Sequence, residues 1–313
     1  MDATGQYANH MPSNLSRGFW HLADPKISIT SAASMAIGAS LAADSPGFSW
    51  IWLLVLGLAM FCMEVAKNAW GDVIDYDSGT DLAVAPEDRT DFSGGKRVMV
   101  DGLLTRSQTW AIAGGFSAAG LALGALMVFV REPMLFPLGV AALALGWSYH
   151  GPPLKLAYRG LGELDVVLIY GPAIAVASYV LMTGSFNSDI IWASVPLGVF
   201  IAAFLWVNEF PDFLADRQCG KRNLVVVLGR YRASRVLPLI YLCGLGLLAL
   251  AIARDTLPVA ASLGAIAALP AGIAVIFTWR EPETFHRQRP VQPMALLAFV
   301  LLSAGISAGV VLG

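Results

Sequence analysis

The sequence predicts an all-α, polytopic membrane protein with nine transmembrane helices. Of its 313 residues, 57% are hydrophobic and only 13% are charged, and the mean hydropathy is +0.65. A soluble domain carries about 25% charged residues. The apolar residues also gather in runs near the length of about 20 residues that a spanning helix needs. These long runs lack the alternation typical of membrane-barrel strands, so we expect helices.

Nine apolar segments are predicted to cross the bilayer. Backbone groups in lipid must be hydrogen-bonded within the segment, which favours a helix at each position. The first segment is rich in Ser and Ala, whereas the other eight carry almost no charge in their interiors. In chain order the segments are 27–43, 49–66, 108–130, 133–149, 164–184, 190–207, 236–253, 257–279 and 294–313.

The basic residues predict the orientation, because cytoplasmic loops carry an excess of Lys and Arg. If the N-terminus is cytoplasmic, all of the 20 Lys and Arg residues except Arg131 and Arg254 fall on the inner side. Nine spans then place the C-terminus outside. We divide the chain into a cytoplasmic N-terminal segment, 1–26, and a transmembrane domain, 27–313. The N-terminal segment lacks the apolar core of a signal peptide.

Composition also argues against several other kinds of protein. The three cysteines, Cys62, Cys219 and Cys243, form no CxxC pair, so no disulfide framework or cysteine metal site is expected. The basic residues lie in separate stretches between apolar segments. We therefore expect membrane lipid, and no nucleic acid, as a partner.

Two matching acidic motifs lie at the predicted inner ends of the second and sixth segments. Each combines an Asn with two Asp at spacings that place the three residues on one face of a helix. The Asn-x-x-x-Asp element of the first motif recurs 140 residues later. The motifs are Asn68, Asp72 and Asp75, and Asn208, Asp212 and Asp216. This recurrence suggests two halves that point matching acidic stripes at a shared cavity.

The acidic motifs predict a magnesium site. Carboxylates held close together repel one another unless a cation neutralises them. Oxygen ligands without His or Cys suit Mg²⁺, which usually binds one or two carboxylates together with waters and substrate phosphates. The expected ligands of Mg²⁺ on a diphosphate are Asp72, Asp75, Asp212 and Asp216.

Basic residues near the motifs are candidates for binding the diphosphate. Arg and Lys bind phosphate oxygens and stabilise the charge that develops on a leaving diphosphate. The positive-inside bias alone also explains basic loops, so this alternative stays open for each residue. The candidates are Lys96, Arg97, Lys155, Arg159, Lys221 and Arg222.

A membrane transporter is an alternative to an enzyme, because carboxylates within the membrane often mark transport pathways. Transporter sites typically lie near the midplane in broken helices. Here the acidic stripes lie at helix ends that long cytoplasmic loops follow, which favours an enzyme. Three further acidic residues of the first loop, Asp77, Asp88 and Asp91, are interpreted as solvated loop residues.

Taken together, the motifs resemble those of the UbiA superfamily of intramembrane prenyltransferases, over most of the chain from about Asp24. The stretch from Asn68 to Asp81, with "SGTD", resembles the 1,4-dihydroxy-2-naphthoate prenyltransferases of menaquinone biosynthesis. The same is true of "SGGKRVMVDGLL", "YHGPPLKLAYRGLGE" and "DFLADRQCGKRNLVVVLG". The Arg-Pro-Lys-like element of that branch appears here as Asp24-Pro25-Lys26.

The resemblance implies nine helices around a central cavity that opens to the cytoplasmic side of a bacterial inner membrane. It also implies Mg²⁺-dependent transfer of a polyprenyl chain from its diphosphate to an aromatic acceptor, most similar to 1,4-dihydroxy-2-naphthoate. Asn68 and Asn208 would assist the four aspartates in catalysis. Tyr149 is the candidate for holding the acceptor or stabilising the allylic cation.

Other activities within the superfamily stay open at this point. A UbiA-type terpene cyclase would ionise the same diphosphate without an aromatic acceptor. Another transferase could use 4-hydroxybenzoate, a chlorophyll precursor or a glycerol-phosphate lipid as acceptor.

Overall fold

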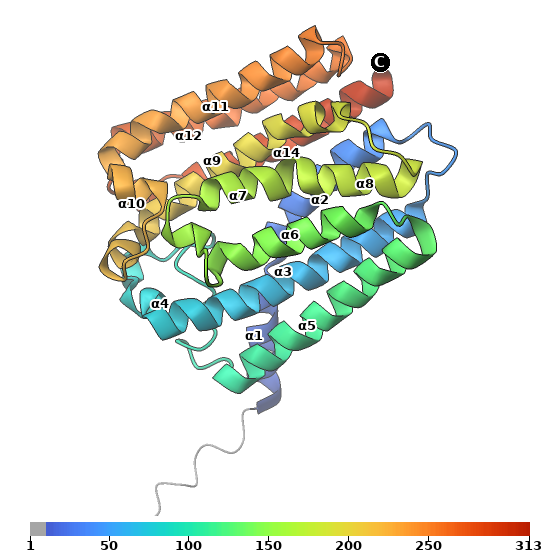
Figure 1. Cartoon of the computed structure of the whole chain (residues 1–313). Coiled ribbons are helices and arrows are strands. Elements are labelled where there is room, and N and C mark those ends of the chain that lie inside the picture. Colours follow the sequence, from blue (N-terminus) through green and yellow to red (C-terminus); the bar gives the residue numbers. More distant parts are fainter. Residues whose placement is uncertain (1–10) are drawn as a thin grey trace, which may run out of the picture.

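The computed structural model describes residues 11–313, and this part of the chain is helical without any strand. The longer elements lie side by side, with short connections at their ends (Figure 1). They are α1 (Met11–Ala23), α2 (Pro25–Leu41), α3 (Trp50–Ser78), α5 (Arg106–Leu126) with the π-turn η2 (Met127–Arg131), α6 (Leu135–His150), α7 (Gly162–Leu168) with the π-turn η4 (Ile169–Ala173) and α8 (Ile174–Thr183), α9 (Asp189–Gln218), α11 (Arg230–Ala253), η5 (Val259–Ala267) with α12 (Ala268–Arg280), and α14 (Val291–Leu312). The short elements are α4 (Thr80–Ala83), η1 (Pro86–Asp88), η3 (Leu156–Tyr158), α10 (Leu224–Leu228) and α13 (Phe285–Gln288).

Seven helical runs are long and apolar enough to cross a membrane, and each covers one of the predicted segments. They are Trp50–Ser78, Arg106–Arg131, Gly162–Thr183, Asp189–Gln218, Arg230–Ala253, Val259–Arg280 and Val291–Leu312. The other two predicted segments, 27–43 and 133–149, coincide with α2 and α6, which are helices of 17 and 16 residues. The prediction of several apolar membrane helices is confirmed, whereas the count of nine stays a prediction.

The two helices that carry the acidic motifs are the longest of the described chain. α3 has 29 residues and α9 has 30, so each spans roughly 44–45 Å at 1.5 Å per residue. The hydrocarbon core of a bilayer is about 30 Å thick. Both helices therefore continue past the ends predicted at 66 and 207, and the additional turns carry the acidic motifs.

α9 lies at the centre of the fold and packs against α2, α7, α11 and α14. Within its most apolar window 72% of residues are buried inside the protein, compared with 17% for the run that contains α5. Figure 1 shows α11 and α12 on one side of this centre, and α3 and α5 on the other. α9 therefore holds its acidic motif rigidly, because neighbours enclose the helix on several sides.

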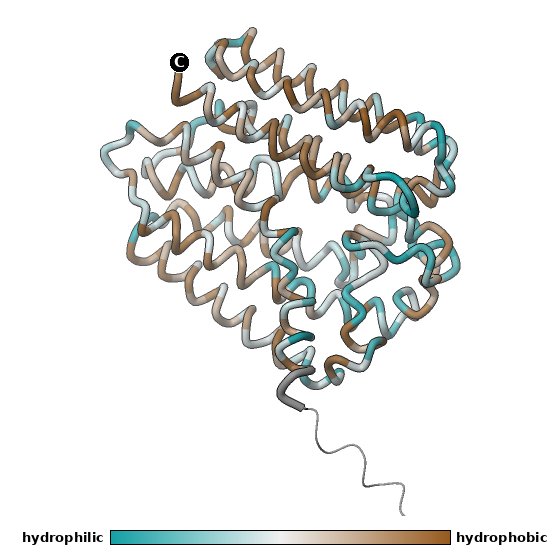
Figure 2. The backbone as a smooth tube through the Cα atoms, turned by 180° about the vertical axis from the view of Figure 1, so that it is seen from behind, coloured by the Kyte–Doolittle hydropathy of each residue, from teal (hydrophilic) through white to brown (hydrophobic). Residues whose placement is uncertain are grey.

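Hydrophilic segments gather at one end of the helices, where the loops that contain α4 and α10 lie (Figure 2). Hydrogen bonds to one buried carboxylate, Asp88, tie two of these loops together. The Asp88 carboxylate in η1 binds His286 Nε2 of α13 at 2.8 Å and accepts a hydrogen bond of 2.7 Å from the Arg287 guanidinium. Our interpretation of Asp88 as a solvated loop residue is therefore wrong: its side chain is 4% exposed. Sequence spacing gave no sign of a partner almost 200 residues away.

The close approach of α2 and α8 generates a test of the packing. A Cβ atom on Gly38 would lie 2.2 Å from the Ala175 carbonyl oxygen, whereas one on Gly114 of α5 would meet nothing within 4 Å. Ala is otherwise preferred to Gly in a helix by about 1 kcal/mol, and overpacking costs about 1–3 kcal/mol. Gly38→Ala should lower the thermal unfolding midpoint in detergent. Gly114→Ala should leave it equal or raise it, and equal effects of the two substitutions would contradict this packing.

The Asp88–His286 contact generates a prediction about pH. Burial lowers the pKa of His286. As the pH falls, His286 therefore binds a proton near pH 6.5 in the unfolded chain but only at lower pH in the folded protein. Burial alone would raise the pKa of Asp88, but hydrogen bonds from His286 and Arg287 outweigh it and hold that pKa below its ordinary value. Both shifts make acid destabilising, and His286 acts as the pH falls below about 6.5.

Between pH 7 and pH 5 the thermal midpoint of the wild type should therefore change less favourably than that of His286→Gln, because only the wild type carries the destabilising contribution of His286. The measurement is thermal unfolding of both proteins at a fixed scan rate at pH 7, 6 and 5. Parallel curves for the two proteins would show that His286 makes no contribution to the acid sensitivity.

Candidate active site

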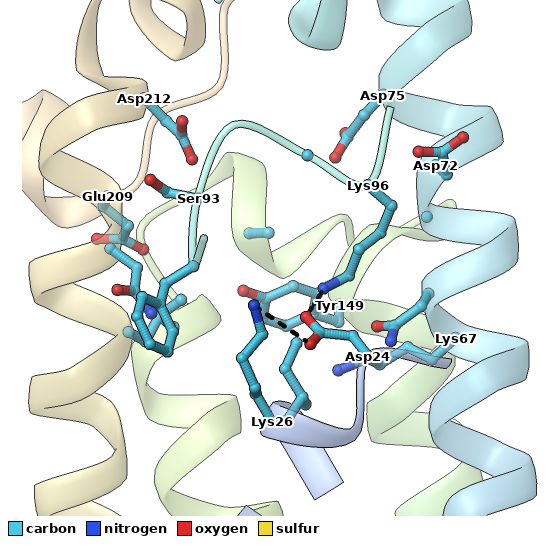
Figure 3. Close-up of a pocket in the computed structure, with 18 of the residues that line it drawn as sticks. Asp24, Lys26, Lys67, Asp72, Asp75, Ser93, Lys96, Tyr149, Glu209 and Asp212 are labelled. Atoms are coloured by element: carbon cyan, nitrogen blue, oxygen red, sulfur yellow. Dashed lines mark hydrogen bonds and ion pairs between the residues drawn. The ribbon is translucent and has the colours of Figure 1, made fainter. Parts of the chain in front are cut away.

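A cavity of about 790 Å³ opens between α3 and α9, beneath the loop that follows α4. The end of α1, the start of α2, the C-terminal end of α6 and the π-turn η4 complete its walls. Figure 3 shows Asp72 and Asp75 reaching into this space from one helix, and Asp212 and Glu209 from the helix opposite. All six residues of the predicted motifs line the cavity: Asn68, Asp72, Asp75, Asn208, Asp212 and Asp216.

The motif on α3 is held by contacts with two other segments. Asn68 Nδ2 donates a 2.8 Å hydrogen bond to the carbonyl oxygen of Leu22, which fixes the end of α1 against α3. Asp75 accepts a 3.0 Å hydrogen bond from the Tyr158 hydroxyl of η3. Asp72 is buried. The backbone N–H groups of Arg97, Val98 and Met99 face its carboxylate, but none of them forms a hydrogen bond of acceptable geometry with it.

The motif on α9 shows a similar division of roles. Asp216 accepts a 2.8 Å hydrogen bond from Asn223 Nδ2 and lies 3.5 Å from the Lys221 ammonium. Asn223 in turn accepts from the amide of Val226 and caps α10, so the turn after α9 is built around Asp216. Asp212 Oδ1 and Asn208 Oδ1 are buried and have no partner within the described chain.

These unpartnered oxygens test whether the site fits a metal ion. A buried carboxylate without a partner is costly, and Asp72 and Asp212 present such oxygens from opposite walls. No three His, Cys, Asp or Glu side chains within residues 11–313 converge closely enough to hold a metal by themselves. This donor set fits Mg²⁺, which commonly takes only one or two carboxylates and completes its shell with waters and phosphate oxygens.

Three of the six predicted diphosphate-binding residues, Lys96, Arg97 and Lys221, line the cavity. Lys96 is paired with Asp24, and Arg97 donates to the carbonyl oxygen of Asp81. Burial alone would lower the pKa of Lys221, but the charges of nearby carboxylates, Asp216 first among them, raise it well above the ordinary value. Lys221 therefore stays charged at any physiological pH.

The other three predicted residues lie elsewhere. Lys155, Arg159 and Arg222 are exposed and do not line the cavity. Arg159 donates to the carbonyl oxygen of Pro153 at 3.2 Å. Their position does not support contact with a diphosphate in the cavity, and the positive-inside bias is sufficient to explain them.

Tyr149, the aromatic candidate from the sequence, lines the cavity. It lies near the C-terminal end of α6, and its ring packs edge-on against His150 with 4.6 Å between the centroids. Figure 3 places Tyr149 behind Lys26 and Lys96, between the two acidic walls.

The structure adds cavity residues that the sequence analysis did not select. Asp81 is buried, and this burial, reinforced by Asp75 and Asp72, raises its pKa to about 8. Tyr158 does not line the cavity itself, but its hydroxyl donates to Asp75 and its ring lies 5.9 Å from the Lys221 ammonium, which links the two motifs. Glu209 and Lys67 immediately adjoin motif residues in the sequence, and this adjacency was the one available signal for them.

The sequence matches the UbiA prenyltransferase family over residues 31–309, nearly the whole chain. The chain belongs to the UbiA prenyltransferase family. This membership confirms the family that the acidic motifs and the basic loop sequences indicated.

Among curated relatives of the UbiA family, the chain is 32% identical over 182 residues to a 2-carboxy-1,4-naphthoquinone phytyltransferase of Synechocystis sp.. That alignment covers 56% of this chain and 55% of the relative, so the match extends over about half of the cyanobacterial protein. The chain is also 26% identical to a 1,4-dihydroxy-2-naphthoate octaprenyltransferase of Haemophilus influenzae, over 68% of this chain and 70% of that one.

Solved structures of UbiA homologues share the fold. The apo structure of a UbiA homolog from Aeropyrum pernix K1 matches with a TM-score of 0.69 at 20% identity, over 89% of this chain and 96% of that one. A UbiA homolog from Archaeoglobus fulgidus, bound to GPP and Mg²⁺, matches with a TM-score of 0.62 at 16% identity, over 95% of this chain and 100% of that one.

The unpartnered oxygens generate a binding prediction. Mg²⁺ with pyrophosphate should raise the thermal midpoint of the purified protein, because a ligand that binds only the folded state stabilises it. Asp72→Asn and Asp212→Asn should each lose most of this rise. Asp44→Asn, which changes an exposed residue beyond the end of α2, should keep it. A full rise in both motif variants would show that these residues do not hold the metal.

Proposed function

We propose that this protein transfers a polyprenyl chain from its diphosphate to an aromatic acceptor in a Mg²⁺-dependent reaction. The observation that carries the proposal is the pair of facing acidic stripes, with unpartnered buried oxygens on Asp72 and Asp212. The family of the chain suggests a prenyl diphosphate as the donor to test, and the names of its relatives suggest an aromatic acceptor.

The proposed reaction breaks one bond and forms another. The C–O bond between the prenyl C1 and the diphosphate breaks, and the diphosphate leaves with the electron pair. The allylic cation is then attacked by a ring carbon of the acceptor, which forms a C–C bond. The ring recovers aromaticity by losing a proton or, for a naphthoate acceptor, its carboxyl group as CO₂. No oxidant or reductant is required.

We assign roles to the cavity residues on the basis of their positions. Asp72, Asp75, Asp212 and Asp216 would hold Mg²⁺, and Asn68 and Asn208 would assist them. When bound, Mg²⁺ supplies positive charge to the leaving diphosphate. Lys96, Arg97 and Lys221 would bind the diphosphate oxygens, and their fixed charges favour the leaving group as its charge develops.

The apolar and aromatic surroundings serve the second half of the reaction. The ring of Tyr149 can stabilise an allylic cation across its face. Apolar side chains such as Ile201 and Leu205 line part of the cavity and would limit the access of water to the cation.

The acceptor that we propose is 1,4-dihydroxy-2-naphthoate, as in menaquinone biosynthesis. Several relatives carry this substrate or the related 2-carboxy-1,4-naphthoquinone in their names. The apolar helices indicate an integral membrane protein. We place it in a bacterial inner membrane with nine spans, a cytoplasmic N-terminal segment and a C-terminus outside, on the basis of the distribution of basic residues.

Membranes that contain the protein should transfer prenyl groups from a labelled polyprenyl diphosphate to 1,4-dihydroxy-2-naphthoate when Mg²⁺ is present. Addition of EDTA should abolish the transfer. Asp72→Ala and Asp212→Ala should lower it at least 100-fold, the scale of losing one electrostatic contact to the transition state. The measurement is the radioactive product extracted into organic solvent, at equal amounts of inserted protein.

Two controls separate the alternatives. Asp44→Asn should retain normal transfer, because this residue is exposed and far along the chain from either motif. Release of diphosphate without transfer to any acceptor in a panel would indicate a terpene cyclase. If the protein shows neither diphosphate release nor prenyl transfer, the enzymatic proposal is refuted and a transporter becomes the better hypothesis.

A further inference from the structure

Four lysines line the cavity, and one of them differs from the rest. Lys26 and Lys96 both pair with Asp24, and Lys221 pairs with Asp216. Lys67 has no acidic side chain within 4.0 Å of its ammonium among the described residues. It extends from α3 on the side of the cavity where Asp72 and Asp75 lie, further along the helix from the loop (Figure 3).

Two acidic residues, Glu64 and Asp165, lie close enough to Lys67 to favour its charge, but neither forms an ion pair with it. Glu64, one turn earlier on α3, accepts hydrogen bonds from the hydroxyls of Ser28 and Ser31 through its two oxygens. Asp165 also lines the cavity but forms no ion pair with Lys67, and its Oδ1 is buried without a partner. The serines therefore satisfy one carboxylate, while the lysine keeps its charge directed at the cavity.

A single contact orients Lys67. Its ammonium donates a 3.2 Å hydrogen bond to the hydroxyl of Tyr170. An ammonium has three donors, so two remain for a ligand. Tyr170 belongs to the π-turn η4, which contains Pro172, and the Ser34 hydroxyl bonds the Tyr170 carbonyl oxygen. π-turns within helices are rare and often occur at functional sites.

An unpaired lysine inside a membrane protein is expensive and usually marks a functional site. The acidic motifs explain the loop side of the cavity but leave Lys67 without a role. Tyr149, Tyr170 and Phe204 also line the cavity, so an aromatic ring can pack near this ammonium. The ligand that fits an ammonium beside aromatic walls is an aromatic molecule with a carboxylate substituent.

We propose that Lys67, oriented by Tyr170, binds the carboxylate of an aromatic acceptor and thereby selects carboxylated acceptors over neutral ones. This inference rests on the proposed function, since it assigns the acceptor end of the same cavity. It gives the cavity two anion sites, one at Lys96, Arg97 and Lys221 for the diphosphate and one at Lys67 for the acceptor.

The first test is direct binding to the purified full-length protein, without any turnover. The probes are 1-hydroxy-2-naphthoate and 1-naphthol, which share a hydroxylated ring system and differ in the carboxylate. The wild type should bind the carboxylate probe at least tenfold more tightly. Lys67→Met should lose this preference, and Lys67→Arg should keep part of it. Arg217→Met, which removes an exposed charge from the end of α9, should behave as the wild type does.

The second test is steady-state kinetics. Lys67→Met should raise KM for 1,4-dihydroxy-2-naphthoate at least tenfold and leave KM for the prenyl diphosphate unchanged. Tyr170→Phe should raise the acceptor KM by a smaller factor. An equal loss of affinity for both probes, an unchanged preference, or a raised KM for the prenyl diphosphate would each overturn the assignment.

The two proposals fail in different ways. If no acceptor is prenylated but the Lys67-dependent preference for the carboxylate probe persists, the proposed transferase activity fails and the anion site stands. If prenyl transfer occurs but Lys67→Met binds both probes with the same affinities as the wild type, the transferase proposal stands and the anion-site proposal fails. Thermal midpoints of Lys67→Met and Lys67→Arg, measured without ligand, identify any variant that has simply not folded.

Discussion

The mutual repulsion of carboxylates on two facing helices is the constraint around which this structure is arranged. Asp72 is buried and Asp212 is half-buried, yet buried oxygens of both lack partners, because they face a shared cavity from α3 and α9. Such groups are tolerated only where a cation or a hydrogen-bond donor can reach them. The lengths of α3 and α9 place the acidic motifs at this cavity, and two contacts hold the neighbouring motif carboxylates: Tyr158 donates to Asp75, and Asn223 donates to Asp216.

The cavity is electrostatically divided, and this division is what the proposed chemistry requires. Carboxylates and the cations Lys96, Arg97 and Lys221 lie toward the loops, where a metal-bound diphosphate would be held. Lys67, together with tyrosines, lies further along α3. In the proposed reaction the diphosphate group leaves as an anion, and the acceptor carries a carboxylate. The two anions would compete for the same cations if these lay together, and the spatial separation of the cations avoids that competition.

The loops contribute more than connections between spans. Asp88 joins the loop after α4 to α13 through His286 and Arg287, and Asp24 joins the start of α2 to Lys96. Each contact links segments that are remote in the sequence, and both lie at the hydrophilic end of the helices. These ion pairs join the loops to one another at the polar end of the fold.

The sequence by itself determined that the chain is a helical membrane protein and that Asn68, Asp72, Asp75, Asn208, Asp212 and Asp216 belong together. Both conclusions depend on local periodicity: apolar runs set the spans, and spacings of three and four residues set a helix face. Only the tertiary structure decided which basic residues share the cavity, since Lys155 and Arg159 lie outside it while Lys67 lines it. Charge at a given position in a loop looks the same in the sequence whether the loop folds over the cavity or away from it. The physical reason is that side-chain partners such as Asp24 with Lys96, or Asp88 with His286, are fixed by packing between distant segments, which no local pattern records.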